Sequence, residues 1–122
     1  MQYKFRGKIK DTGEWVYGSY IDFDLIHQII PIGKSKAVIV LPSSVGMWTG
    51  LADKTTTNMY EGDIIRYTEY NSSGADIPNC VSVIKFDEGS FLPVSEGYCI
   101  NTEIIGNTTD NPELLETEAQ NE

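Results

Sequence analysis

The sequence predicts a mainly β protein with a single core. Of its 122 residues, 40% are hydrophobic and 11% are aromatic, a composition too apolar for a disordered chain. The 11 glycines and the scarcity of long helical patterns favour many turns. Short stretches alternate between polar and apolar residues, which is the period of a strand. Together these three observations predict short strands joined by turns.

The first predicted element is a β-hairpin. The stretch YKFRGKIK at residues 3–10 alternates apolar residues with cations, so one face of this strand is apolar and the other is cationic. The cationic face carries Lys4, Arg6, Lys8 and Lys10. Asp11-Thr12-Gly13 has turn chemistry, because Asp can bond its own backbone and Gly accepts a positive φ. The chain therefore returns antiparallel from residue 14.

Two shorter segments follow the hairpin. LIHQII at residues 25–30 fits either a helical turn or an edge strand, and Pro31 ends it. AVIVL at residues 37–41 is an apolar run typical of a buried strand, and it is far shorter than the about 20 residues that span a bilayer. No apolar signal-peptide stretch follows Met1, so we expect a cytoplasmic protein.

Four strands are predicted in the second half of the chain. They are IIRYTEY at 64–70, CVSVIKF at 80–86, FLPV at 91–94 after a tight turn, and EIIGN at 103–107. An exposed loop at 71–79 separates the first two. Asn111 is predicted to cap a short helix with Pro112 at its first position, and we expect the chain to fray beyond Glu116.

The Glu-Gly-Asp triplet at residues 61–63 is the best candidate for chemistry. Gly62 tolerates a left-handed or bulged backbone, and Asp63 can accept hydrogen bonds from the amides that a sharp turn leaves unpaired. Small barrels of the SH3-like kind use such a Gly-Asp step where a strand enters the barrel. The stretch around the triplet contains no His or Cys, so we interpret it as a structural corner and not as a catalytic site.

No metal or cofactor site is predicted. His27 with Asp22 and Asp24 offers too few ligands on one face. GKS at 33–35 resembles the end of a phosphate-binding loop, but residue 28 is Gln where that loop requires Gly. Cys80 and Cys99 have no CxxC spacing, so we expect free thiols. With one histidine in the chain, a hydrolase triad is also disfavoured.

Charge is distributed unevenly along the chain. Residues 1–85 contain nine basic and nine acidic residues, so the whole net charge of −9 lies beyond Lys85. This acidity weighs against nucleic acids and anionic membranes as partners. The cationic strand leaves nucleic-acid binding open as an alternative. Aromatic side chains beside such a strand could stack on bases. We interpret the four candidates mainly as residues of the hydrophobic core: Trp15, Tyr17, Trp48 and Tyr60.

Three blocks of the sequence together resemble the YopX family, proteins encoded by phages and prophages of Gram-positive bacteria. The blocks are KFRGKIKDTGEWVYGSYI at 4–21, VGMWTGLADKTTTNMYEGDIIRY at 45–67, and EIIGNTTDNPELL at 103–115. Their motif residues are Trp48, Gly50, Tyr60, Gly62, Asp63, Asn111 and Pro112. Thr55-Thr56-Thr57 departs from the family's usual turn rich in Asn and Gly.

The resemblance implies one domain with an N-terminal β region at 1–45, an SH3-like barrel portion at 46–116 and an acidic tail at 117–122. It implies no catalytic residues. We therefore expect a non-catalytic module in the cytoplasm of a bacterial host that binds a protein partner or associates with itself through exposed strand edges or the acidic tail. The alternative is a nucleic-acid-binding module that uses the face of Lys4, Arg6, Lys8 and Lys10.

Overall fold

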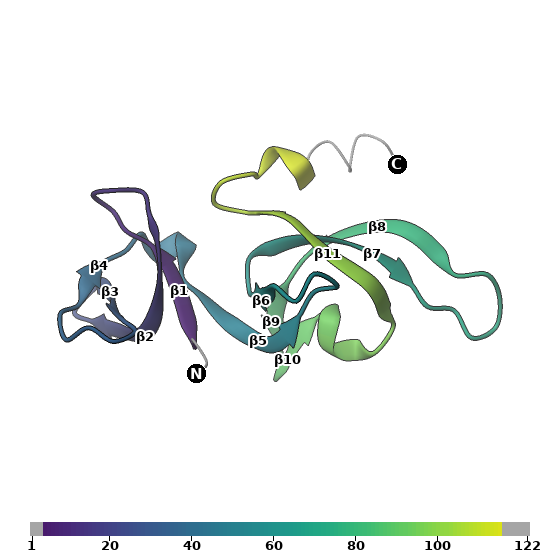
Figure 1. The fold of residues 1–122 in the computed structure, drawn as a ribbon, viewed down its shortest axis with the longest axis horizontal. Coiled ribbons are helices and arrows are strands. Elements are labelled where there is room, and N and C mark those ends of the chain that lie inside the picture. The colour runs from purple at the N-terminus through teal and green to yellow at the C-terminus, as the bar shows by residue number, and fades with distance from the viewer. Residues whose placement is uncertain (1–3, 116–122) are drawn as a thin grey trace. The chain divides into compact units, whose positions relative to one another are not determined.

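The computed structural model describes residues 4–115 and confirms the mainly β class (Figure 1). The chain divides into two compact units, Met1–Trp48 and Thr49–Glu122, which we call the N-terminal unit and the C-terminal unit. The predicted acidic tail at 117–122 lies outside the described residues.

The N-terminal unit is an antiparallel sheet whose first four strands are neighbours in chain order, with the start of the fifth strand beside the first. Its elements are β1 (Phe5–Lys8), β2 (Trp15–Phe23), β3 (Ile26–Pro31), β4 (Val38–Ile39), a 3₁₀ turn η1 (Pro42–Ser44) and the start of β5 (Gly46–Ala52). The strand order is β4-β3-β2-β1-β5. The predicted hairpin is β1 with β2, and the ambiguous segment after it is a strand, β3. It pairs with β2 along its whole length.

One face of this sheet forms the core of the N-terminal unit. Val16, Ile29 and Val40 are buried there. Gly7 allows Ile29 and Val40 to pack directly against the backbone of β1, because a Cβ on this residue would lie only 3.0 Å from both Ile29 Cδ1 and Val40 Cβ. Gly18 allows β2 and β3 to pair at all, because its Cβ would lie 2.0 Å from the Ile30 carbonyl oxygen.

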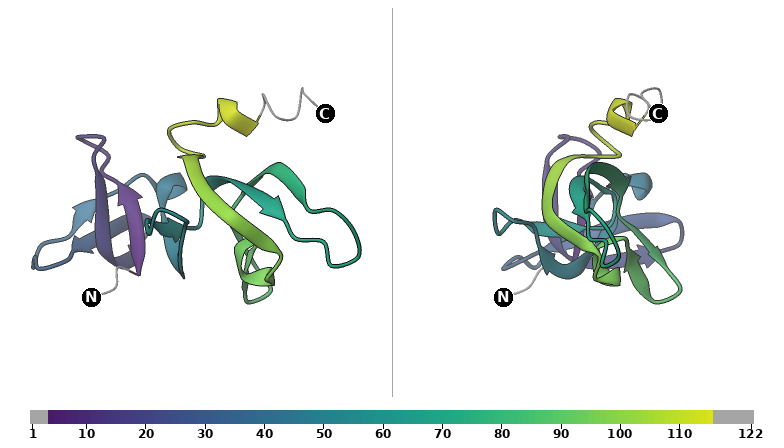
Figure 2. Two further views of the ribbon diagram at one scale, coloured as in Figure 1. Left: turned by 45° about the vertical axis from the view of Figure 1, so that its right-hand side comes forward. Right: turned by 90° about the vertical axis from the view of Figure 1, so that its right-hand side faces the viewer.

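The C-terminal unit contains the remaining strands. They are β6 (Asn58–Tyr60), β7 (Asp63–Glu69), β8 (Ile77–Val83), β9 (Lys85–Asp87), β10 (Ser90–Leu92) and β11 (Cys99–Asn107), with a 3₁₀ turn η2 (Val94–Glu96). β7 is the centre of a three-stranded antiparallel sheet of order β11-β7-β8, and β9 pairs with β10. β11, the yellow-green strand of Figure 2, pairs antiparallel with β7 from Cys99 to Asn107.

The core of the C-terminal unit lies on one face of β7. Met59, Ile65, Tyr67 and Ile84 are buried together, with the two free cysteines packed at the edge. Among residues 4–115 the strands do not close into a barrel, which corrects that part of the expectation, because β11 and β8 each pair on one side only. The C-terminal unit is therefore an open sheet with a hairpin beside it.

Several predicted boundaries shift. β8 begins at Ile77 because this residue pairs with Glu69 across a bulge, which shortens the predicted loop at 71–79. β11 begins at Cys99, earlier than expected. Helical backbone is present at residues 113–115, at the end of the described range.

Candidate functional site

The Gly62-Asp63 corner is built from backbone hydrogen bonds. Gly62 has φ +95°, and the Asp63 side chain is 2% exposed. Its Oδ2 accepts a hydrogen bond from the Tyr60 amide at 2.8 Å. The Gly62 amide donates to the Ile84 carbonyl at 2.9 Å, and the Ile84 amide donates to the Asp63 carbonyl at 2.9 Å. The carboxylate of Asp63 thus stabilises the turn that precedes β7.

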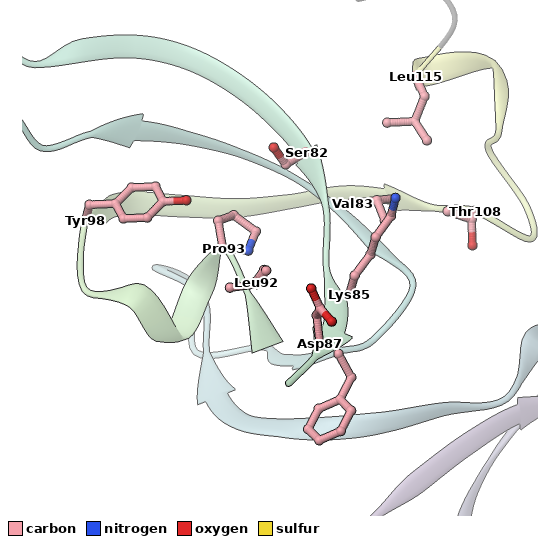
Figure 3. A pocket seen from close by; sticks show the side chains of 10 residues that line it. Ser82, Val83, Lys85, Asp87, Leu92, Pro93, Tyr98, Thr108 and Leu115 are labelled. Atoms are coloured by element: carbon pink, nitrogen blue, oxygen red, sulfur yellow. The ribbon is translucent and has the colours of Figure 1, made fainter. Parts of the chain in front are cut away.

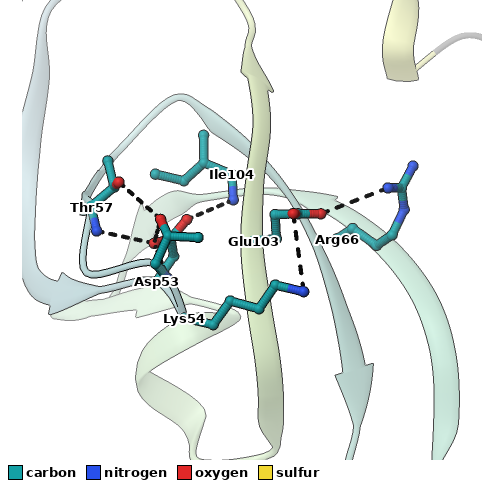
Figure 4. A network of polar contacts seen from close by, with 7 residues as sticks. Asp53, Lys54, Thr57, Arg66, Glu103 and Ile104 are labelled. Carbon is teal, nitrogen blue, oxygen red and sulfur yellow. Dashed lines mark hydrogen bonds and ion pairs between the residues drawn. The ribbon is translucent and has the colours of Figure 1, made fainter.

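A second buried carboxylate, Asp53, organises the turn before β6, and the sequence reasoning missed it (Figure 4). Asp53 is 8% exposed. Its Oδ1 accepts hydrogen bonds from the Thr55 amide at 2.9 Å, the Thr55 hydroxyl at 2.6 Å and the Thr57 amide at 3.0 Å. Its Oδ2 accepts one from the Ile104 amide at 3.1 Å. This carboxylate therefore ties the turn of Thr55-Thr56-Thr57 to β11.

Hydrogen bonding controls the ionisation of Asp53. Burial raises the pKa of this carboxyl, but the bonds from Thr55, Ile104 and Thr57 outweigh burial, so its pKa lies below the ordinary value. Beside it, Glu103 pairs with Lys54 at 4.0 Å and Arg66 at 3.9 Å. All three side chains are well exposed, and such pairs contribute little to stability.

The other motif residues also make backbone contacts. The Trp48 amide donates to the Lys4 carbonyl at 2.8 Å, and Gly50 has φ +84°. Asn111 was expected to cap a helix, but its Oδ1 accepts a hydrogen bond from the Asn107 amide at 3.2 Å. The side chain thus binds back to the end of β11 and lies close above Gly106, where a Cβ would come within 2.7 Å of it. Pro112 follows it and accepts a hydrogen bond from the Leu115 amide at 3.2 Å.

Possible metal ligands are scattered. Among residues 4–115, no three side chains of His, Cys, Asp or Glu come close enough to hold an ion. His27 lies between two β2 side chains, with Nδ1 bonded to the Tyr20 hydroxyl and Nε2 4.0 Å from Asp22 Oδ1.

The C-terminal unit has an open groove with a volume of about 690 Å³ (Figure 3). Its apolar lining includes Phe86, Leu92, Pro93 and Leu115. Lys85 and Asp87, both exposed, add one cation and one anion to the lining. The groove was not predicted, because its lining comes from β8, β9, β10, the segment between β10 and β11, and the chain after β11.

The predicted cationic face is only partly exposed. Lys4 and Lys10 are exposed and Lys8 is half-buried, but Arg6 is only 7% exposed. The Arg6 guanidinium carbon lies 4.7 Å from the centre of the Trp15 ring, a cation–π geometry. Because β1 lies between β2 and β5, its central side chain is covered by neighbours. The four cations of this face are therefore not equally accessible.

The turn between β2 and β3 exposes three large apolar side chains. Phe23 is 72% exposed, Leu25 91% and Ile26 47%. We call Phe23, Asp24, Leu25 and Ile26 the apolar tip. Asp24 and Leu25 have φ +50° and +67°, as in a type I′ hairpin turn, where Asn and Gly are favoured. A bulky apolar residue in this conformation is an outlier, and the sequence reasoning missed it.

Comparison with known proteins identifies the fold and leaves the site unassigned. A family model described as YopX protein matches residues 4–116. The chain is also similar to the crystal structure of protein EF1440 from Enterococcus faecalis, with a TM-score of 0.58, 22% sequence identity, and coverage of 94% of this chain and 99% of that chain. The comparison with curated proteins gave no match. No helix within residues 4–115 has the length and apolar character needed to cross a membrane.

Proposed function

The chain belongs to the YopX family, and from this premise we propose that it is a non-catalytic module that binds another protein, either a partner or a second copy of itself. We place this role in the cytoplasm of a bacterial host, during the life of a phage or prophage. The observation that carries the proposal is the apolar tip, with Phe23 and Leu25 mostly in solvent.

The conformation of the tip supports a binding role. An L-residue in the left-handed region costs roughly 1–2 kcal/mol, and Asn or Gly would fit this turn better. Exposing Leu25 there adds a second unfavourable term, because apolar surface stays in water. Strained, exposed apolar residues are typical of binding sites, where the partner offsets the cost.

The buried carboxylates support a non-catalytic role. Asp53 and Asp63 are the most buried acids of the described residues, and both accept hydrogen bonds from backbone amides. The Asp53 carboxylate accepts four hydrogen bonds and has few lone pairs left for a substrate. Asp63 is 2% exposed, so a substrate has little access to it.

The test replaces Leu25 with Asn. Asn tolerates a positive φ, so Leu25→Asn is expected to raise the melting temperature slightly while removing the protruding side chain. Self-association is followed by sedimentation velocity, and partner binding by capture from host lysate with wild type and variant in parallel. The proposal fails if the variant and the wild type associate and capture identically.

A second candidate function, binding of single-stranded nucleic acid, is favoured by one observation. The register sets Lys8 opposite Trp15 and Arg6 opposite Tyr17, so cations and aromatic rings share a sheet face, as in proteins that stack bases. The burial of Arg6 argues against this second function. Titration of labelled DNA and RNA oligonucleotides at low salt decides: affinity that falls steeply with salt supports it, and no binding excludes it.

A further inference from the structure

The groove of the C-terminal unit is lined in part by an extended stretch of chain. Residues 82, 83 and 85–87, which end β8 and form β9, all contribute to the lining (Figure 3). Among residues 4–115, β8 pairs with β7 alone and β9 pairs with β10 alone, so each of these strands has one edge outside the sheet pairing. The backbone groups of such an edge are best satisfied by another extended chain. The groove is therefore suited to an extended segment.

The lining offers places for the apolar side chains of such a segment. Phe86 is 47% exposed, and its ring centre lies 4.9 Å from that of Phe91. Leu92, Pro93 and Leu115 add aliphatic surface to the lining. The volume of about 690 Å³ lies within the range of sites that enclose several apolar groups. We therefore expect alternate side chains of the occupant to be apolar, because alternate side chains of an extended chain share one face.

Charges around the groove select a basic occupant. The segments that line it, residues 82–98 and 108–115, contain five acidic residues and one basic residue, Lys85. All five acids are exposed: Asp87, Glu88, Glu96, Asp110 and Glu113. The whole chain has a net charge of −9, so it attracts cationic partners at long range and repels copies of itself. A segment that carries lysine or arginine thus complements the groove, and a second copy of this chain does not.

The turn between β9 and β10 places one of these carboxylates in an unfavourable backbone conformation. Glu88 has φ +49° and Gly89 has φ +84°, as in a type I′ turn, where Asn-Gly is the favoured pair. Glu is strained in the left-handed region, whereas Asn visits it more readily. The turn therefore has a negative charge beside Asp87 where a neutral residue would suit the backbone better. Such a strained residue is expected where its side chain serves binding.

We propose that the groove binds an extended basic segment of another protein. Apolar side chains of the segment occupy the groove, and its lysine or arginine side chains pair with Asp87, Glu88 and the other acids around it. This surface is additional to the apolar tip, because the groove belongs to the C-terminal unit and the tip to the N-terminal unit. Because charge contributes, binding weakens as salt rises.

Fluorescently labelled synthetic peptides are the probes. The lysine–leucine peptide has the sequence Lys-Leu-Lys-Leu-Lys-Leu-Lys. The lysine–serine peptide has serine in place of leucine, and the glutamate–leucine peptide has glutamate in place of lysine. Fluorescence anisotropy during titration with the full chain at low salt measures binding. We expect the lysine–leucine peptide to bind at least about tenfold more tightly than either of the other two peptides.

Variants of the chain assign this binding to the groove. The double variant Asp87→Asn/Glu88→Asn removes two carboxylates, and Asn at residue 88 fits the turn, so the melting temperature should not fall. Its affinity for the lysine–leucine peptide should fall at least about threefold. Phe86→Thr removes apolar lining from an exposed strand position and should weaken binding by a similar factor. The matched control is Glu14→Lys, at an exposed acid of the N-terminal unit, which changes the net charge by the same amount as the double variant.

The outcomes separate binding in the groove from attraction by net charge. The inference is overturned if the lysine–leucine peptide does not bind, if the lysine–serine peptide binds equally well, or if Glu14→Lys weakens binding as much as the double variant does. Leu25→Asn should bind the peptide as the wild type does, and a loss in this variant would move the site to the tip and also overturn the inference. Failure here leaves the proposed function of the tip standing, because that function is measured with Leu25→Asn and without the peptides.

Discussion

Removing the carboxylate of Asp53 should destabilise the C-terminal unit. In Asp53→Ala, three backbone amides (Thr55, Thr57 and Ile104) lose the acceptor that they have at 2.9–3.1 Å. A buried donor without an acceptor costs about 1–3 kcal/mol. The amides of the exposed threonines regain water, whereas Ile104 is half-buried and regains less. We therefore expect a loss of about 2–4 kcal/mol in the free energy of unfolding.

The effect should depend on pH. The folded-state pKa of Asp53 is lowered, so its contribution is present above the unfolded-state pKa of about 3.9 and is lost as pH falls through the folded value. The difference in stability between the wild type and Asp53→Asn, which has no ionisable group here, should therefore shrink on acidification below about pH 4.

Urea denaturation followed by far-UV circular dichroism is the appropriate assay. Trp15 and Trp48 both belong to the N-terminal unit, so tryptophan fluorescence would follow the wrong unit. Asp87→Asn, an exposed acid of the same unit, is the control and should change stability by less than about 0.5 kcal/mol. A loss below about 1 kcal/mol in Asp53→Ala, or a difference that persists unchanged at pH 2, would refute the reasoning.

Three other changes test the remaining architecture. Asp63→Asn should lower the melting temperature, since a neutral amide accepts more weakly from the Tyr60 amide at 2.8 Å; an unchanged melting temperature with a changed biological activity would instead favour a catalytic role. Gly18→Ala should cost more than about 3 kcal/mol or prevent folding, because its methyl would lie 2.0 Å from the Ile30 carbonyl oxygen; wild-type stability in thermal denaturation would contradict the β2–β3 register. Cys99 should alkylate slowly at pH 8, since burial, with Cys80 and Glu69 nearby, raises its pKa to about 11 and leaves roughly one thiol in a thousand ionised; peptide mapping after iodoacetamide treatment measures this, and rapid labelling would count against it.

Local patterns predicted the strands, because the alternation and turn residues that define a strand are close together in the sequence. The alternation at residues 3–10 and the turn at Gly13 are sufficient to specify the first hairpin, and the triplet at 61–63 marked the start of β7. An alternating pattern assigns a side chain to a face but does not show which neighbour covers it, so the burial of Arg6 and its contact with Trp15 were not predicted.

Long-range contacts account for the features that the sequence did not reveal. Asp53 accepts a hydrogen bond from the amide of Ile104, 51 residues further along the chain. No local sequence pattern predicts a partner at that distance. The groove is lined from several strands for the same reason. Leu25 was missed because turn rules expect Asn or Gly at its position, so its presence there became informative only once its φ and exposure were known.

The strand β5 has a practical consequence for dividing the protein into fragments. Its first residues pair with β1, its later residues neighbour β6, and the division between the units falls inside it, after Trp48. Cleavage at that point would leave each half with a severed strand and with unsatisfied backbone groups at its edge. Fragments intended to fold separately should therefore overlap, one ending at Ala52 and the other beginning at Gly46.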